Sequence, residues 1–167
     1  MTTYSVTNAP FAFGNTSVTQ WVGVRAGSYE LKVSQIEFTG WNYNHFYVLA
    51  SAYRYTGATL SGGTAITPAP LREGSAPATA TARAGGSVTG TQIRLSSQYT
   101  GGSGNPTPGT NPPVNTFGLT MNYPFDLTIA AGSAVAIGIY NYTTGSGASG
   151  QGSVTIYFEE LRLSWHY

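Results

Sequence analysis

The chain contains no cysteine and very little charge. The absence of cysteine excludes disulfides, thiolate metal sites and cysteine nucleophiles. Charged residues make up 8% of the 167 residues, against about 25% in ordinary soluble domains. One lysine and six arginines are scattered singly, and the net charge is +1. The clustered cations that bind phosphate backbones are therefore missing, and nucleic acid is not an expected partner.

Long apolar runs are also missing. The segment MTTYSVTNAPFAFG has neither the basic region nor the apolar core of a signal peptide. No later run approaches the roughly 18 apolar residues of a membrane span. We therefore expect a soluble, unprocessed protein without a membrane partner. The length predicts a single domain over residues 1–167, with an N-terminal arm at about residues 1–15.

Strand patterns recur, whereas helical periodicity is nearly absent. In SVTQWVGV, Val22 and Val24 share one face and Trp21 lies on the other. The segment FYVLASAYRY is apolar on both faces. This predicts a central strand with one face in the core and a tyrosine-bearing face that packs against a further surface. About eight such strands, separated by Gly, Pro and Asn turns, predict an all-β fold. The expected architecture is a jelly-roll-like antiparallel β-sandwich with long Gly/Pro-rich loops.

The apolar alternation changes phase in two strands and meets a proline in a third. We expect a β-bulge near Ser34–Gln35 and a second one at Glu159–Glu160, because each would restore the facing of the apolar side chains. Pro124 lacks the N–H that a ladder needs, so its segment is expected to form two strands or an edge strand.

Three stretches lack strand character: residues 56–86, 100–114 and 143–152. The first two are rich in proline, which lowers the entropy cost of ordering them, and we expect them to be arms that contact a neighbouring molecule. Residues 100–114 contain four glycines, four prolines and no charge. An assembly contact or a solvent-facing tip is therefore expected there rather than an active-site lid. Residues 143–152 are expected to be a solvated linker.

Groups that carry out catalysis are scarce. Glu37 with Glu159 or Glu160 is a conceivable glycosidase pair, and structural roles for these carboxylates are favoured. The two histidines lie in no recognisable motif, and without cysteines they make no zinc ligand spacing. A single aspartate argues against calcium. We expect no catalytic residue, no metal and no cofactor.

Aromatic residues are abundant, with twelve Tyr, seven Phe and three Trp. In TGWNYNHFYV they alternate, which suits a contact patch or a sugar-stacking platform, while core packing is the simpler interpretation of Trp41. Aromatic residues at the C-terminal end are expected to pack on a neighbouring subunit. The candidate interface residues are Trp41, Tyr43, Tyr47, Tyr53, Tyr55, Pro106, Pro108, Trp165 and Tyr167.

Three segments, AITPAPLREGSAPATATARAG, FDLTIAAGSAVAIGIYNY and VTIYFEEL, resemble in their order the decoration, or cement, proteins of tailed-phage capsids. The resemblance covers about the last two-thirds of the chain. It implies a jelly-roll-like subunit that forms homotrimers on the capsid exterior and clamps the major capsid protein, without enzyme activity or cofactor. It also implies synthesis in the host cytoplasm and residence in the virion. Residues 100–114 have no counterpart in the family pattern.

Other β-sandwich functions remain open. A carbohydrate-binding module or lectin would explain the Tyr, Trp, Asn and Gly content, and a glycan would then be the partner. A phage tail-fibre or receptor-binding tip domain would also be trimeric. A trimeric ligand of the tumour necrosis factor or complement type is disfavoured by the missing signal sequence.

Overall fold

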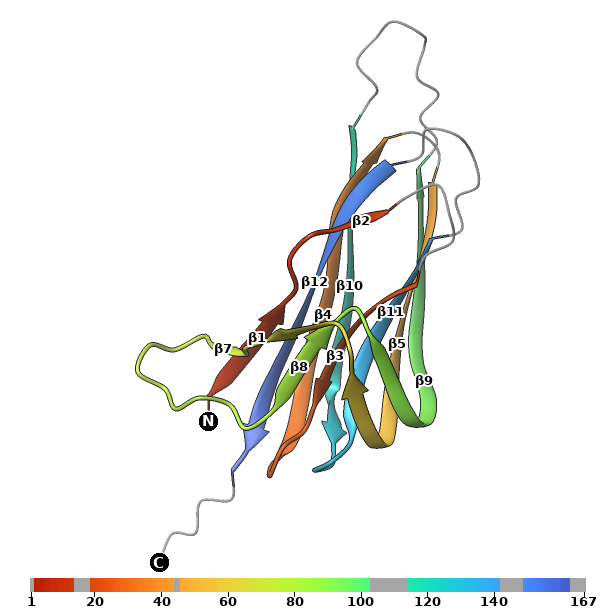
Figure 1. Cartoon of the computed structure of the whole chain (residues 1–167). Coiled ribbons are helices and arrows are strands. Elements are labelled where there is room, and N and C mark those ends of the chain that lie inside the picture. The colour runs from red at the N-terminus through yellow and green to blue at the C-terminus, as the bar shows by residue number, and fades with distance from the viewer. Residues whose placement is uncertain (1, 14–18, 44–45, 103–113, 142–148, 163–167) are drawn as a thin grey trace, which may run out of the picture.

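The computed structural model describes residues 2–13, 19–43, 46–102, 114–141 and 149–162, with only the backbone at some positions of these ranges. The described chain is all strand and turn (Figure 1). Its strands are β1 (Thr3–Thr7), β2 (Phe11–Phe13), β3 (Thr19–Arg25), β4 (Glu30–Tyr43), β5 (Phe46–Ser61), β6 (Thr64–Ile66), β7 (Ala69–Pro70), β8 (Thr81–Ala84), β9 (Ser87–Gly102), β10 (Val114–Ile129), β11 (Ala134–Asn141) and β12 (Ser149–Leu161).

The strands form two antiparallel sheets packed as a sandwich, which confirms the predicted fold class. Sheet A has the order β10-β4-β12-β1-β7, with β2 paired to β12, and sheet B has the order β6-β8-β3-β11-β5-β9. Eight of these strands carry the sandwich: β1, β3, β4, β5, β9, β10, β11 and β12. Numbered in chain order, they lie first-eighth-third-sixth in sheet A and second-seventh-fourth-fifth in sheet B. This is the double Greek key of a jelly roll.

The core lies between the sheets and follows the predicted alternation. Val135, Ile137 and Ile139 of β11 are fully buried, as are Ile156 and Phe158 of β12. Side chains of a strand alternate between its faces, so each strand contributes one row of apolar residues to the layer. Ile93 of β9 does not belong to this layer, because the residue is 44% exposed. It belongs to an edge strand, where the sheet ends and solvent begins.

One predicted bulge is confirmed and the other is wrong. Between β4 and β12, Gln35 pairs with Tyr157 and Val33 pairs with Phe158, so Ser34 is the extra residue. At the second site the pairing of β12 with β4 runs through Glu159 and Glu160 without interruption, and the pairing with β1 extends to Glu159. The even-numbered side chains of β12 point inward as far as Glu160, which is 3% exposed.

Pro124 lies where the prediction places an interruption. The register of β10 against β4 shifts between Asn122 and Leu127, so the ladder is broken around the proline. β10 is also the edge strand of sheet A. A residue without an N–H is tolerated at an edge and in an irregular stretch.

Two segments that we expected to be arms contain strands of the sandwich, and these expectations are corrected except for residues 71–80, which project from it. Within the expected N-terminal arm, β1 pairs with both β12 and β7, and Tyr4 and Val6 are buried in the core. Residues 56–86 contain the end of β5 together with β6, β7 and β8. Both segments supply strands to sheet edges, where pairing satisfies their backbone groups.

Strands β5 and β9 form a long ribbon whose distal end turns onto the outer face of sheet B. The register between them shifts between Thr56 and Thr59. Beyond this shift, Leu60 and Val88 pack, together with Trp21, against the buried residues around Tyr53 and Tyr55 on the outer face. The ribbon therefore covers part of a sheet face that would otherwise meet solvent.

Candidate functional site

Four aromatic rings gather on the outer face of sheet B, from three adjacent strands. Trp21 of β3 lies with its ring centroid 5.6 Å from that of Tyr53, 6.3 Å from that of Tyr55 and 6.2 Å from that of Tyr140. The ring pairs are tilted or edge-on, which is the favoured geometry for aromatic contacts. We call Trp21, Tyr53, Tyr55 and Tyr140 the aromatic cluster.

A glycine on the neighbouring strand makes room for Trp21. Gly138 of β11 pairs directly with Trp21 across the sheet. A Cβ atom at Gly138 would lie 3.0 Å from both Cη2 and Cζ3 of the indole ring. The missing side chain thus allows the ring to approach the backbone of β11, which is a known way to protect a glycine in a strand.

Polar groups complete the aromatic cluster. The Arg94 guanidinium lies 5.5 Å from the ring centroid of Tyr53, and Gln92 Nε2 donates to the Tyr55 hydroxyl at 2.9 Å. Burial raises the pKa of Tyr140, and its hydrogen bond with Tyr53 raises it further. Burial also acts to raise the pKa of Tyr53, but hydrogen bonds and the Arg94 charge outweigh it, so that pKa is lowered.

Tyr53 and Tyr55 were expected to be exposed contact residues, and this expectation is corrected. Each side chain is 4% exposed. The surface against which they pack is their own chain, namely Trp21, Tyr140 and the bent end of the ribbon. They stabilise the fold and leave almost no area for a partner.

The register places three further candidates at one end of the sandwich. Trp41 and Tyr43 lie near the end of β4, and Tyr43 pairs with Val114, the first residue of β10. Tyr47 near the start of β5 pairs with Gly101, next to the last residue of β9. The segment that contains Pro106 and Pro108 therefore leaves and enters the sheets beside these positions. Pro106, Pro108, Trp165 and Tyr167 lie outside the described residues.

A buried carboxylate fastens the opposite end of the molecule. Glu160 Oε1 accepts hydrogen bonds from the Thr79 backbone N–H at 2.5 Å, the Thr79 hydroxyl at 2.8 Å and the Ala80 N–H at 2.9 Å. Glu160 Oε2 forms an ion pair with Arg162 at 2.9 Å. A buried carboxylate is tolerated only with such partners. We call Glu160, Arg162 and Thr79 the clasp.

Arg162 extends the clasp to other segments. One of its terminal nitrogens donates to the Tyr4 hydroxyl at 3.3 Å and to the Pro77 carbonyl at 3.0 Å. Its guanidinium also lies 5.3 Å from the ring centroid of Tyr29. Four segments that are distant in sequence are thus joined at the end of β12.

The clasp predicts acid sensitivity. Burial alone would raise the pKa of Glu160, but the hydrogen bonds from Arg162, Thr79 and Ala80 outweigh it and lower the pKa. A lowered pKa adds stability above the ordinary glutamate range, about 4.3, and this contribution is lost as the pH falls through the folded-state value. Urea unfolding at pH 7 and pH 3 should show wild type more stable than Glu160→Gln at pH 7, with a smaller difference at pH 3. An equal difference at both values would contradict the assignment.

Residues 71–80, between β7 and β8, form a projection that we call the finger. In Figure 1 it extends to the left of the sandwich. Its outgoing arm begins where β7 pairs with β1, and the Leu71 N–H donates to the Thr3 carbonyl at 2.9 Å. Its returning arm is held by Tyr4, whose hydroxyl donates to the Ala76 carbonyl at 2.9 Å, and by the clasp.

The tip of the finger is a tight turn. The Ser75 N–H donates to the Arg72 carbonyl at 3.3 Å, and Gly74 has a φ of 75°. A positive φ at this position fits a turn that favours glycine. Glu73 occupies the turn and is exposed, and Leu71 beside it is 58% exposed. The tip therefore presents one large apolar side chain, the Arg72 guanidinium and the Glu73 carboxylate to solvent.

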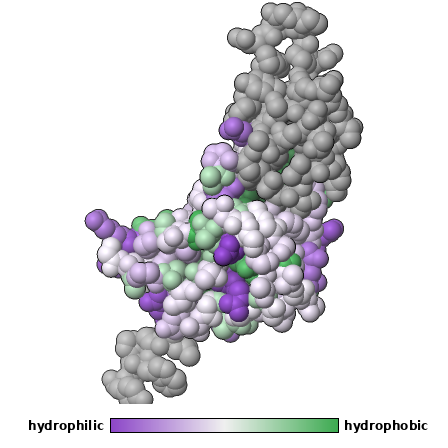
Figure 2. All heavy atoms as spheres, viewed as in Figure 1, coloured by the Kyte–Doolittle hydropathy of each residue, from purple (hydrophilic) through white to green (hydrophobic). Residues whose placement is uncertain are grey.

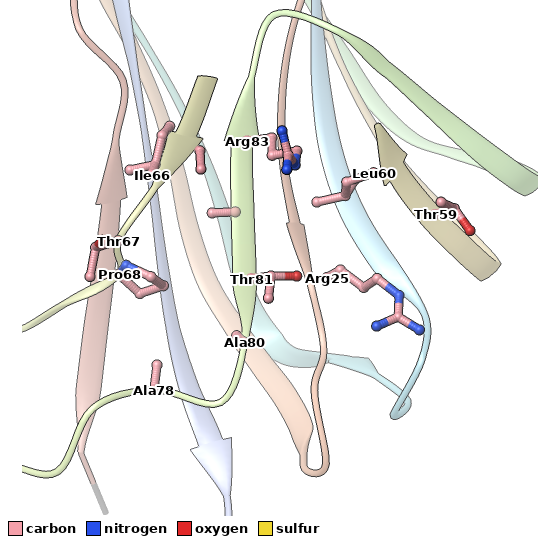
Figure 3. Close-up of a pocket in the computed structure, with 12 residues that line it drawn as sticks. Arg25, Thr59, Leu60, Ile66, Thr67, Pro68, Ala78, Ala80, Thr81 and Arg83 are labelled. Atoms are coloured by element: carbon pink, nitrogen blue, oxygen red, sulfur yellow. The ribbon is translucent and has the colours of Figure 1, made fainter. Parts of the chain in front are cut away.

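A groove of about 620 Å³ runs beside the root of the finger (Figure 3). Leu60, Ile66 and Pro68 contribute apolar walls, and Arg25 and Arg83 contribute positive charge. Arg25 donates to the Ala58 carbonyl at 2.7 Å and Arg83 to the Gly62 carbonyl at 2.8 Å, so both also brace the ribbon end. We call this the arginine groove.

No carboxylate among the described residues lines the arginine groove, and the suggested pair of Glu37 and Glu160 lies on opposite faces of sheet A. Glu37 accepts hydrogen bonds from Gln35 and Tyr157 on the outer face of sheet A, whereas Glu160 points inward. Within the described ranges, no group of three or more His, Asp or Glu side chains is placed to hold a metal ion. No described helix has the length and hydropathy of a membrane span.

Comparison with protein-family models, with curated proteins and with solved structures gave no match. Support for a function therefore comes from the residues and their geometry.

Figure 2 shows one face whose described surface is mostly pale, with hydrophilic residues at the projection on the left and no broad hydrophobic area.

Sequence reasoning missed the clasp, the groove and the role of Trp21. Glu160 carried one available signal, because it continues the inward phase of Val154, Ile156 and Phe158. A carboxylate in such a phase indicates a buried, hydrogen-bonded group. No local pattern brings Arg25 and Arg83 together, since the pairing of β3 with β8 joins residues far apart in sequence.

Proposed function

We propose that this chain is a non-enzymatic virion structural protein, a capsid decoration protein that binds the outer surface of the major capsid protein lattice as a homotrimer and stabilises the shell. It would be made in the host cytoplasm and would act on the capsid exterior. The jelly-roll topology is compatible with this role, since the fold recurs in viral capsid domains, although a fold does not by itself determine function.

The observation that supports the proposal best is the finger. It lies within the segment AITPAPLREGSAPATATARAG, which carries part of the family resemblance. The structure holds this segment on both arms by β1, Tyr4 and the clasp, and exposes its tip. A braced projection loses little conformational entropy on binding, which favours contact with a protein surface.

The low charge supports the same proposal. Removing charged groups from water costs free energy, so a contact that is stabilised by buried surface favours a surface with few charges. Charged residues make up only 8% of this chain. The two sixteen-residue edge strands β9 and β10 contain a single charged residue each, Arg94 and Asp126. Side chains of β9 bond to β10 where Gln98 donates to the Thr120 carbonyl, and the remaining length of these edges, with so little charge, is suited to contacts with other protein chains.

The test is binding to capsids. Purified protein should elute as a trimer in size-exclusion chromatography with multi-angle light scattering, and it should cosediment with expanded capsids assembled from the major capsid protein encoded in the same genome. Bound capsids should resist heating better than bare capsids. A monomer that stays in the supernatant would refute the proposal.

A carbohydrate-binding module is the second candidate. The strand positions of Trp41, Tyr43 and Tyr47 lie at one end of the sandwich, beside the ends of a long segment, and jelly rolls also occur among lectins. Under this alternative, Trp41→Ala should abolish binding on a glycan array without changing the oligomeric state. Capsid binding that is unaffected by Trp41→Ala would favour the first proposal.

A further inference from the structure

We infer that the finger of one copy inserts into the arginine groove of a second copy of this chain, with Leu71 on the apolar walls and Glu73 beside Arg25 and Arg83. This inference deepens the proposed function and rests on its trimer component. It assigns the two surfaces through which the copies meet.

The tip of the finger has exposed groups without partners among the described residues of its own chain. Leu71 is 58% exposed and is the most exposed of the large hydrophobic side chains in the described part of the chain. Glu73 is exposed too, and none of the hydrogen bonds or ion pairs found in the described residues involves its carboxylate. The turn at Gly74 and the bracing of both arms keep this pair projecting from the sandwich.

The arginine groove has the complementary chemistry. Arg25 and Arg83 face the same side of sheet B, because Arg25 pairs with Thr81, two residues from Arg83 on β8. Each guanidinium donates a hydrogen bond to a backbone carbonyl through one nitrogen, and its other N–H groups remain as further donors. Within the described residues no carboxylate bonds to either one. Leu60 and Ile66 line the same groove (Figure 3).

The finger cannot fill the arginine groove of its own chain. Ala78 and Ala80 of its returning arm are themselves part of the groove wall, while the tip leads away from the sandwich in Figure 1. Every copy therefore carries both a donor surface and an acceptor surface. Two different surfaces that meet head to tail generate a ring when the rotation closes. A cyclic trimer satisfies all of its fingers and all of its grooves.

The experiment measures self-association of the full chain by analytical ultracentrifugation. Leu71→Asp and Glu73→Lys each alter only exposed tip residues, and each should raise the dissociation constant of the trimer at least about tenfold, as expected for an interfacial charge pair or apolar anchor. Arg72→Ala is the matched control from the same turn and should leave the trimer intact. Glu73→Lys combined with Arg83→Glu should recover most of the lost affinity.

The outcomes separate the inference from the proposed function. A wild-type monomer at all concentrations would overturn both. A wild-type trimer that is unaffected by Leu71→Asp and Glu73→Lys would overturn this inference alone and leave a trimer of another geometry. Arg83→Glu also removes the bond to Gly62, so calorimetry checks its folding, and the two tip variants decide the matter if it does not fold.

Discussion

Glu160→Ala should lower the free energy of unfolding by about 3 kcal/mol, which is the scale for removing one partner of a buried, hydrogen-bonded charge pair. The variant leaves the N–H groups of Thr79 and Ala80 without their acceptor. It also removes the ion pair with Arg162 at the end of β12. Urea unfolding at pH 7, followed by tryptophan fluorescence, measures the change.

Glu159→Ala is the matched control for this prediction. Glu159 is the adjacent carboxylate on the same strand, but its side chain accepts one hydrogen bond, from the Thr3 hydroxyl at 3.2 Å, and is partly exposed. Its replacement should cost under about 1 kcal/mol. Equal losses for the two variants would show that the buried clasp has no special role.

Loss of the clasp should also affect the finger. Its returning arm is held by Glu160, Arg162 and Tyr4, so the segment should exchange its amide hydrogens faster in Glu160→Ala than in wild type. Hydrogen exchange resolved to peptides 67–82 would detect this change. The trimer should then weaken in Glu160→Ala, because a mobile finger loses more entropy on insertion.

Trp21→Ala should destabilise the protein by about 3 kcal/mol, within the range for truncating a large aromatic side chain. For a domain of this size that corresponds to a fall in Tm of roughly 6–12 °C. The substitution removes the ring that contacts Tyr53, Tyr55 and Tyr140, and it uncovers the backbone at Gly138. Calorimetry is the suitable measurement, because the variant loses part of the tryptophan signal.

Tyr140→Phe tests whether packing or hydrogen bonding holds the aromatic cluster. It keeps the ring beside Trp21 and removes one hydroxyl, whose bond to the Tyr53 hydroxyl is 3.4 Å long. The expected cost is under about 1 kcal/mol. If Tyr140→Phe were as damaging as Trp21→Ala, the cluster would depend on its hydroxyl network instead of its ring contacts.

Alternation along single strands was predictable, because it depends only on neighbouring residues. The inward rows of β11 and β12 and the bulge at Ser34 follow from the two-residue period of a strand. The error at Glu159–Glu160 has a physical cause. The prediction followed the phase of the apolar side chains alone, whereas the inward row ends in Glu160, and the hydrogen bonds that allow its burial come from residues 79–80, which no local pattern reveals.

The sequence by itself determined the fold class, since alternating apolar residues, frequent turn residues and few helix formers leave an antiparallel sandwich as the way to bury both faces. Only the tertiary structure decided which surfaces are available. Tyr53 and Tyr55 are closed off by a ribbon from their own chain, while the finger and the arginine groove become neighbours through the pairing of β7 with β1 and of β8 with β3. Such contacts join residues distant in sequence, and their energies depend on packing that local sequence does not encode.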